Sequence, residues 1–216
     1  RKRSSTPSSR AKSETDGSAF KSAAKGKTAS VTKKAIVTLA VGAEYAGRFD
    51  RMCRKNWAAY AERHGYDVIV IREPLDTSDR AQRRSPAWQK CLILGVPEVA
   101  GYERVVWVDS DIYLNPAAPS VVDGVPLERI GAVDEHVFPT REARQAILRG
   151  IVAHAPDTGE LNKEFWRACF DAGSWHAYMG LPAGQAHIVQ TGVMVLSPRH
   201  HRDLFEHVYR NYEDGG

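Results

Sequence analysis

Short runs of apolar residues alternate with stretches of helical periodicity along most of this chain. Four runs rich in β-branched side chains have the pattern of buried strands: residues 35–41, 66–71, 104–114 and 189–196. Residues 130–134 form a shorter run of the same kind. Between them, apolar positions recur every three to four residues and predict helices over 44–64, 86–96, 141–153, 162–172 and 198–212. This alternation favours an α/β, Rossmann-like fold with a mostly parallel central sheet and helices on both faces.

The first 34 residues differ in composition from everything that follows. They contain ten Lys and Arg, two acidic residues and twelve Ser and Thr, with Phe20 as their single aromatic. Such a segment buries too little apolar area to offset the entropy of ordering it, so we expect residues 1–34 to be a disordered, basic, Ser- and Lys-rich tail. Its charge suits contact with an acidic surface, a membrane or RNA, and a solvated linker or stem is the simpler alternative.

Charge and composition narrow the class of protein. The whole chain has a net charge of +4, but residues 35–216 hold twenty Lys and Arg against twenty-four Asp and Glu, which argues against nucleic-acid binding by this part. The sequence contains no run of about 18 apolar residues and therefore predicts no transmembrane segment. Without a signal peptide, an anchor or an Asn-x-Ser/Thr site we expect a cytoplasmic protein; the alternative is a luminal enzyme released from an N-terminal anchor, with residues 1–34 as its stem.

The strongest chemical signal is a pair of aspartates after an apolar strand. Val105–Val108 lead directly into Asp109-Ser110-Asp111, and in an extended strand two side chains so spaced share a face, about 7 Å apart. Open sheets bind ligands at the carboxyl ends of their strands, and Mn²⁺ and Mg²⁺ prefer carboxylate and phosphate oxygens. We therefore predict that Asp109 and Asp111 bind Mn²⁺ or Mg²⁺, which would neutralise a diphosphate leaving group.

The same pair of aspartates is compatible with two further roles. Acidic residues often end strands simply because water solvates them there. A phosphatase of the haloacid-dehalogenase type also carries Asp-x-Asp after an apolar strand, with the first aspartate as nucleophile. That motif usually follows the first strand and has Thr or Val two places on, whereas here it lies in the third strand and Tyr113 takes that place.

Four segments in order resemble GT-A-fold glycosyltransferases. They are AIVTLA at 35–40 with Tyr45 after it, WQK at 88–90, WVDSD at 107–111 and QTGVMVL at 190–196. Over residues 35 to about 212 the chain is similar to yeast-type galactosyltransferases and plant xylosyltransferases, and to glycogenin-like enzymes. The resemblance implies transfer of a sugar from a nucleotide sugar, a UDP-sugar in these families, to a hydroxyl of a glycan, protein or small molecule. It also implies retention of the anomeric configuration, and a non-catalytic nucleotide-sugar-binding module is the alternative.

The same resemblance implies substrate-binding roles. Thr38 and Ala40 would hold the nucleoside through the backbone, and Tyr45 would pack on the uracil unless it is a buried aromatic of its helix. Lys90 would lie near the diphosphate and the donor sugar, although a solvated helix lysine is the alternative. Ser110, between the two aspartates, joins this substrate-binding set.

Further roles concern the donor sugar. Asp134 or Glu135 would accept hydrogen bonds from its hydroxyls, and by position alone they are candidates for the catalytic chemistry, unless water solvates both at a strand end. Gln190, where the family has Asn, joins these catalytic candidates; it would contact the sugar through its amide or else satisfy backbone groups. Gly192 would allow close backbone approach.

The family also has a third metal ligand, usually His, well beyond this last strand. Twenty-four residues follow Gly192, and none of their histidines lies in the expected context. We therefore expect residues 35–216 to be the nucleotide-sugar-binding catalytic domain without a C-terminal portion. The alternative is a minimal version of the domain in which water completes the metal shell.

Overall fold

The computed structural model describes residues 32–182 and 184–212. Most of the predicted tail, up to residue 31, lies outside the described residues. The first strand begins at Lys34, one residue earlier than the composition change suggests.

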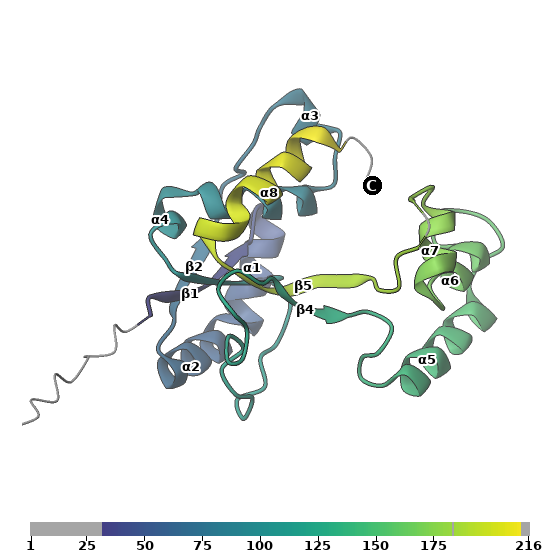
Figure 1. The fold of residues 1–216 in the computed structure, drawn as a ribbon, viewed down its shortest axis with the longest axis horizontal. Coiled ribbons are helices and arrows are strands. Elements are labelled where there is room, and N and C mark those ends of the chain that lie inside the picture. The colour runs from purple at the N-terminus through teal and green to yellow at the C-terminus, as the bar shows by residue number, and fades with distance from the viewer. Residues whose placement is uncertain (1–31, 183, 213–216) are drawn as a thin grey trace, which may run out of the picture. The chain divides into compact units, whose positions relative to one another are not determined.

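The described residues form one five-stranded sheet with helices around it (Figure 1). The strands are β1 Lys34–Leu39, β2 Asp67–Ile71, β3 Arg104–Val108, β4 Gly131–Asp134 and β5 Val189–Leu196. The helices are α1 Ala43–Met52, α2 Arg54–His64, α3 Asp79–Gln82, the 3₁₀ helix η1 Pro86–Gly95, α4 Pro97–Ala100, α5 Arg141–His154, α6 Lys163–Ala168, α7 Ala172–Tyr178 and α8 Pro198–Asn211.

The order of the strands across the sheet is β2-β1-β3-β5-β4. β1 pairs in parallel with both β2 and β3, whereas β5 is antiparallel to both β3 and β4. Four strands therefore run in one direction and β5 runs in the other. The predicted α/β, Rossmann-like fold with a mostly parallel sheet is confirmed.

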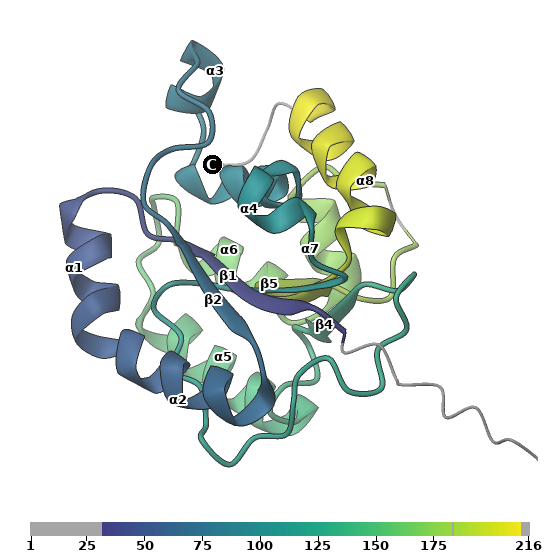
Figure 2. The same ribbon diagram turned by 90° about the vertical axis from the view of Figure 1, so that its left-hand side faces the viewer.

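Two hydrophobic layers hold the sheet between helices. On one face Ile36 and Val106 pack under α1 and α2, where Phe49 and Trp57 meet edge to face with ring centroids 5.0 Å apart. On the other face Val37 and its neighbours pack against η1, α4 and α8. Figure 2 shows α4 and α8 on the opposite side of the sheet from α1 and α2. β3 is buried along its whole length, which explains why its sequence is continuously apolar rather than alternating.

The predicted helix over 44–64 is two helices that meet at Cys53, which has φ −103°. Gly42 precedes α1 with φ 84° and Gly65 follows α2 with φ 69°, a left-handed conformation that glycine adopts without steric cost. The predicted helix over 162–172 is also divided, because α6 ends at Ala168 and α7 begins at Ala172.

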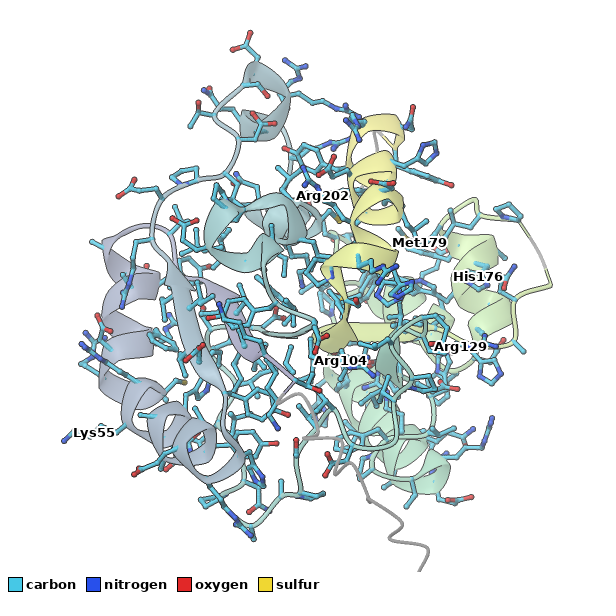
Figure 3. All side chains as sticks on the ribbon, turned by 60° about the vertical axis from the view of Figure 1, so that its left-hand side comes forward. Lys55, Arg104, Arg129, His176, Met179 and Arg202 are labelled. Atoms are coloured by element: carbon cyan, nitrogen blue, oxygen red, sulfur yellow. The ribbon has the colours of Figure 1, made fainter. Side chains whose placement is uncertain are left out.

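The prediction of a strand over 104–114 is wrong beyond Val108. Asp109 opens a turn in which the Ile112 amide donates to the Asp109 carbonyl at 3.1 Å. Asn56 on α2 then fixes Leu114, donating to its carbonyl and accepting from its amide, both at 2.7 Å. Ile112 and Leu114 are apolar because they pack on the α1–α2 layer, and not because they continue the strand. Lys55, next to Asn56, points away from this layer (Figure 3).

Between β4 and β5 the chain forms α5, α6 and α7, which pack on one another and lie together in Figure 1. Phe165 joins α6 to α7 through edge contacts with Trp175 and Tyr178, at 5.5 and 6.0 Å between centroids. Among the residues that the structure describes, no helix has the length and apolar character needed to cross a membrane.

Candidate functional site

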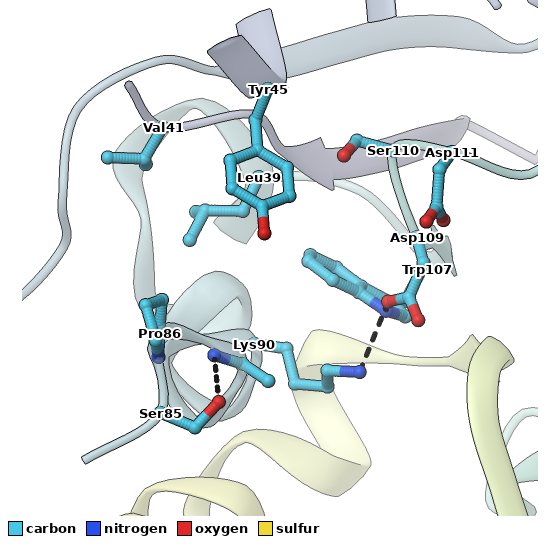
Figure 4. Close-up of a pocket in the computed structure, with 11 residues that line it drawn as sticks. Leu39, Val41, Tyr45, Ser85, Pro86, Lys90, Trp107, Asp109, Ser110 and Asp111 are labelled. Atoms are coloured by element: carbon cyan, nitrogen blue, oxygen red, sulfur yellow. Dashed lines mark hydrogen bonds and ion pairs between the residues drawn. The ribbon is translucent and has the colours of Figure 1, made fainter. Parts of the chain in front are cut away.

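A pocket of about 310 Å³ opens where β1 and β3 end (Figure 4). The segments after the two strands form one side of it, and the start of η1 forms another. Its lining residues are Leu39, Val41, Tyr45, Ser85, Pro86, Ala87, Lys90, Trp107, Asp109, Ser110 and Asp111. Five of the residues expected to bind substrate or metal are therefore together in one cavity: Tyr45, Lys90, Asp109, Ser110 and Asp111.

Asp109 is held in the pocket by hydrogen bonds to both its side chain and its backbone. Its Oδ1 accepts a hydrogen bond from Trp107 Nε1 at 2.8 Å and another from Lys90 Nζ at 3.1 Å. Its amide donates to the Gly192 carbonyl at 2.8 Å, so the residue is also anchored to β5. Both side chains that donate to this carboxylate come from elements packed in the layer beneath α8, which leaves Asp109 little freedom.

Lys90 connects three parts of the chain at this point. From η1 it reaches Asp109 after β3 and lies within 3.4–3.5 Å of the Thr191 hydroxyl and carbonyl in β5. Its ammonium also lies 5.4 Å from the centroid of the Trp107 ring. The Lys90 side chain is 13% exposed, so the alternative of a solvated helix lysine does not hold.

Asp111 and Tyr45 form the more open side of the pocket. Tyr45 is 55% exposed at the start of α1, so it is not a buried aromatic of its helix. Asp111 is exposed in the turn after β3, and its charge acts on the buried Cys53. Burial, and then the charge of Asp111, raise the pKa of the Cys53 thiol, which keeps that thiol neutral.

Thr38 and Ala40 do not line this pocket with their side chains. Both are fully buried on the face covered by α1 and α2, and the Ala40 amide donates to the Ile71 carbonyl at 2.9 Å. Because side chains alternate along a strand, the neighbouring Leu39 and Val41 face the pocket instead.

Asp134 is the last residue of β4 and Glu135 follows it, and neither lines the pocket. Asp134 Oδ2 lies 2.5 Å from His187 Nδ1, and its Oδ1 accepts from the His136 amide at 2.9 Å. The hydrogen bond from His187, followed by that amide, lowers the pKa of Asp134. Glu135 forms an ion pair with Arg144 of α5.

Gln190 and Gly192 lie at the start of β5, next to the pocket through Thr191. Gln190 Oε1 accepts a hydrogen bond from the Gly192 amide, so this side chain satisfies a backbone group as the alternative expected. A Cβ on Gly192 would lie 2.8 Å from Gln190 Oε1 and 3.2 Å from Ile112 Cδ1. A side chain at position 192 would therefore have to displace the end of the flexible Gln190 side chain.

The pocket offers two carboxylates to a cation. In residues 32–182 and 184–212 no three His, Cys, Asp or Glu side chains gather as a metal site. Asp109 Oδ1 is already hydrogen-bonded, and Oδ2 has no hydrogen-bond partner among these residues. A pair of carboxylates without a third protein ligand suits Mn²⁺ or Mg²⁺, which commonly take their other oxygens from substrate phosphates and water. The donor set therefore fits such an ion bound together with a phosphate ligand.

Besides Leu39 and Val41, three further parts of the site are not among the expected residues. Ser85–Ala87 form one wall, and Trp107 and Thr191 hold Asp109 and Lys90 in place. Ser85-Pro86 has the signature of a helix start, and Trp107 in β3 stands two residues before Asp109. Those patterns place the residues in the fold, whereas their contacts depend on the tertiary structure.

No family model matches the chain, and no curated protein matches it either. A solved structure that is similar to it is the crystal structure of a glycosyltransferase involved in the glycosylation of the major capsid of PBCV-1. The identity is 16% and the TM-score 0.44, and the match covers 82% of this chain. The match covers 66% of the other chain, so this chain spans slightly under two thirds of that protein's length.

Proposed function

We propose that this protein is a metal-dependent glycosyltransferase that takes a nucleotide sugar, a UDP-sugar in the first instance, as donor. The observation that supports the proposal most is the pocket in which Asp109, Asp111, Lys90 and Tyr45 converge from three separate segments. An acidic pair and a lysine beside an exposed aromatic ring are the groups that a nucleoside diphosphate and its cation require.

The distribution of polar and apolar groups gives the donor an orientation in the pocket. Tyr45, Leu39 and Val41 provide apolar surface for the base and ribose. Lys90 and the two aspartates provide the charged end for the diphosphate and Mn²⁺ or Mg²⁺. The donor sugar would then lie towards the start of β5, where Thr191 contacts Lys90 and Gln190 and Gly192 follow the same strand.

In the reaction, the bond between the anomeric carbon and the diphosphate oxygen breaks, and its electron pair stays on that oxygen. An acceptor hydroxyl oxygen bonds to the carbon, and the hydroxyl proton passes to the released diphosphate or to water. The cation, when bound, would neutralise charge that develops on the leaving diphosphate. Lys90 would donate hydrogen bonds to the same oxygens from a largely buried position, where such bonds are stronger than in water. Asp109 and Asp111 would hold the cation, and Asp134 or Glu135 would contact the donor sugar.

A thermal-shift panel of nucleotides and nucleotide sugars, with and without Mn²⁺, tests this proposal. A ligand at 100 times its dissociation constant adds about 2.7 kcal/mol to the free energy of unfolding, which raises the Tm by roughly 5–10 °C for a domain of this size. We expect UDP with Mn²⁺ to give such a shift and EDTA to abolish it. UDP release from a UDP-sugar would then identify the donor.

Matched variants make the test specific to the pocket. Asp109→Asn and Asp111→Asn should lose most of the Mn²⁺-dependent shift and of UDP release. Asp157→Asn removes an exposed aspartate paired with Lys163 in another part of the chain and should change neither. A panel without any nucleotide shift contradicts the proposal, and a covalent phospho-aspartate at Asp109 would indicate the phosphatase. UDP binding without turnover of any donor would indicate a non-catalytic binding module.

A further inference from the structure

Lys90 occupies a position that conflicts with simple cation binding at Asp109. Its ammonium lies 3.1 Å from the oxygen Oδ1, within ion-pair distance, and it also donates hydrogen bonds to Thr191. A divalent cation that approached Asp109 would meet this positive charge directly beside its ligand. The protein therefore already carries a counter-ion for one of its two pocket carboxylates.

The surroundings keep this counter-ion in place. Trp107 is 3% exposed and is packed in the layer under η1 and α8, with its ring 5.4 Å from the Lys90 ammonium. Its Nε1 donates to the same Asp109 oxygen that Lys90 contacts, so that oxygen is fixed from two sides. The carboxylate cannot turn away from Lys90 without breaking the bond to the buried indole.

We propose that Lys90 is a built-in counter-ion of Asp109, and that its ammonium leaves this carboxylate only when a divalent cation and a diphosphate bind together. The idea deepens the proposed function and rests on it, since it takes this pocket as the site of a metal–diphosphate ligand. With Lys90 paired to Asp109, the three charged side chains of the pocket sum to −1, carried by Asp111. A cation alone gains one free carboxylate and is repelled by the ammonium.

A diphosphate changes this balance. Its oxygens give the Lys90 ammonium new acceptors, so that both carboxylates become available to the cation. Each ligand then favours the other, and by linkage the cation raises the affinity for diphosphate by the same factor as diphosphate raises the affinity for the cation. Lys90 is thus the side chain that couples the two binding events.

The test measures Mn²⁺ binding without nucleotide, which requires no enzymatic activity. Free Mn²⁺ is followed by its electron paramagnetic resonance signal, and UDP binding is followed by calorimetry with and without Mn²⁺. Lys90→Met keeps the length of the side chain and removes its charge. We expect it to bind Mn²⁺ alone about tenfold more tightly than the wild type, and UDP in the presence of Mn²⁺ about tenfold more weakly.

The matched control is Lys163→Met. It removes a lysine of α6 that forms an ion pair with Asp157, and it should change neither the Mn²⁺ affinity nor the UDP affinity. Lys90→Gln repeats the test with a polar neutral side chain in case the methionine perturbs packing. Unchanged or weaker Mn²⁺ binding in both Lys90 variants would overturn the inference. If the Lys90 variants bind Mn²⁺ more tightly but bind UDP as tightly as the wild type does, the part of the inference that concerns diphosphate is wrong. If the wild type binds no UDP under any condition, the proposed function fails, whereas the Mn²⁺ comparison still decides whether Lys90 opposes the cation.

Discussion

The hydrogen bond between the Trp107 indole and Asp109 should make a measurable contribution to folding. Trp107→Phe keeps an aromatic ring in the same layer but removes the N–H that donates to Asp109 Oδ1 at 2.8 Å. Asp109→Ala removes the acceptor and leaves the indole N–H, which is buried, without its partner. The two variants and their combination form a double-mutant cycle. The cycle gives the coupling free energy of this hydrogen bond, separate from the effects of the smaller ring and of the lost contact with Lys90.

The expected coupling can be worked out from the geometry. A hydrogen bond to a charged group contributes about 1.5–3 kcal/mol when both groups are buried. The Asp109 side chain is 36% exposed, so water competes for its oxygen and reduces the value. We therefore expect a coupling free energy of about 1–2 kcal/mol, on top of roughly 1–2 kcal/mol that Trp107→Phe costs through lost packing.

Urea unfolding followed by far-ultraviolet circular dichroism measures all four proteins of the cycle. Trp166→Phe is the matched control, because Trp166 Nε1 donates to the Leu161 carbonyl at 3.1 Å and not to a carboxylate. Its combination with Asp109→Ala should be additive. A coupling below about 0.3 kcal/mol between Trp107 and Asp109 would show that the indole does not hold the carboxylate.

Three further predictions concern neighbouring parts of the fold. Asn56→Ala removes both side-chain hydrogen bonds to Leu114 and should lower the free energy of unfolding by about 2–3 kcal/mol in urea; a loss under about 1 kcal/mol would contradict the anchoring role. Burial, followed by a hydrogen bond to a carboxylate, raises the pKa of Tyr209 to about 12, so its stabilisation is present below about pH 10 and is lost as the pH rises through 12. Tyr209→Phe should show a shallower loss of stability between about pH 10 and 12, and an unchanged slope would refute this. The pKa of Asp134 is lowered by His187, so its stabilisation is complete above about pH 4 and is lost as the pH falls through the folded-state pKa. Asp134→Asn should therefore flatten the acid side of the unfolding profile, and equal acid sensitivity of both proteins would count against the His187 contact.

The layered fold follows from the sequence because buried strands and amphipathic helices have distinct periods. β1, β2 and β5 lie within a residue or two of their apolar runs. The direction of β5 was not predictable, because a strand buried between layers has the same apolar pattern in either orientation. The end of β3 was predicted too far along the chain, because Ile112 continues the apolar pattern of the strand. Ile112 is apolar for a different reason, since it packs on the α1–α2 layer from a turn.

The candidate site was predictable where it is local in sequence. Asp109 and Asp111 stand directly after a buried strand, and that position alone placed them at an edge of the sheet. The ion pair between Lys90 and Asp109 and the contact of Lys90 with Thr191 join residues 19 and 101 positions apart. No periodicity encodes such contacts, which arise only when η1, β3 and β5 are packed together.

The reversed direction of β5 has a consequence for how the protein is made. Because antiparallel neighbours begin where the other ends, β5 brings Gly192 beside the end of β3, where its carbonyl accepts from the Asp109 amide. About eighty residues are translated between Asp109 and Gly192. A nascent chain therefore contains both aspartates long before the hydrogen bond between the Asp109 amide and the Gly192 carbonyl can form. The contacts that tie Asp109 and Lys90 to β5 can therefore form only late in synthesis, and contacts of such high sequence separation are among the slower ones to form.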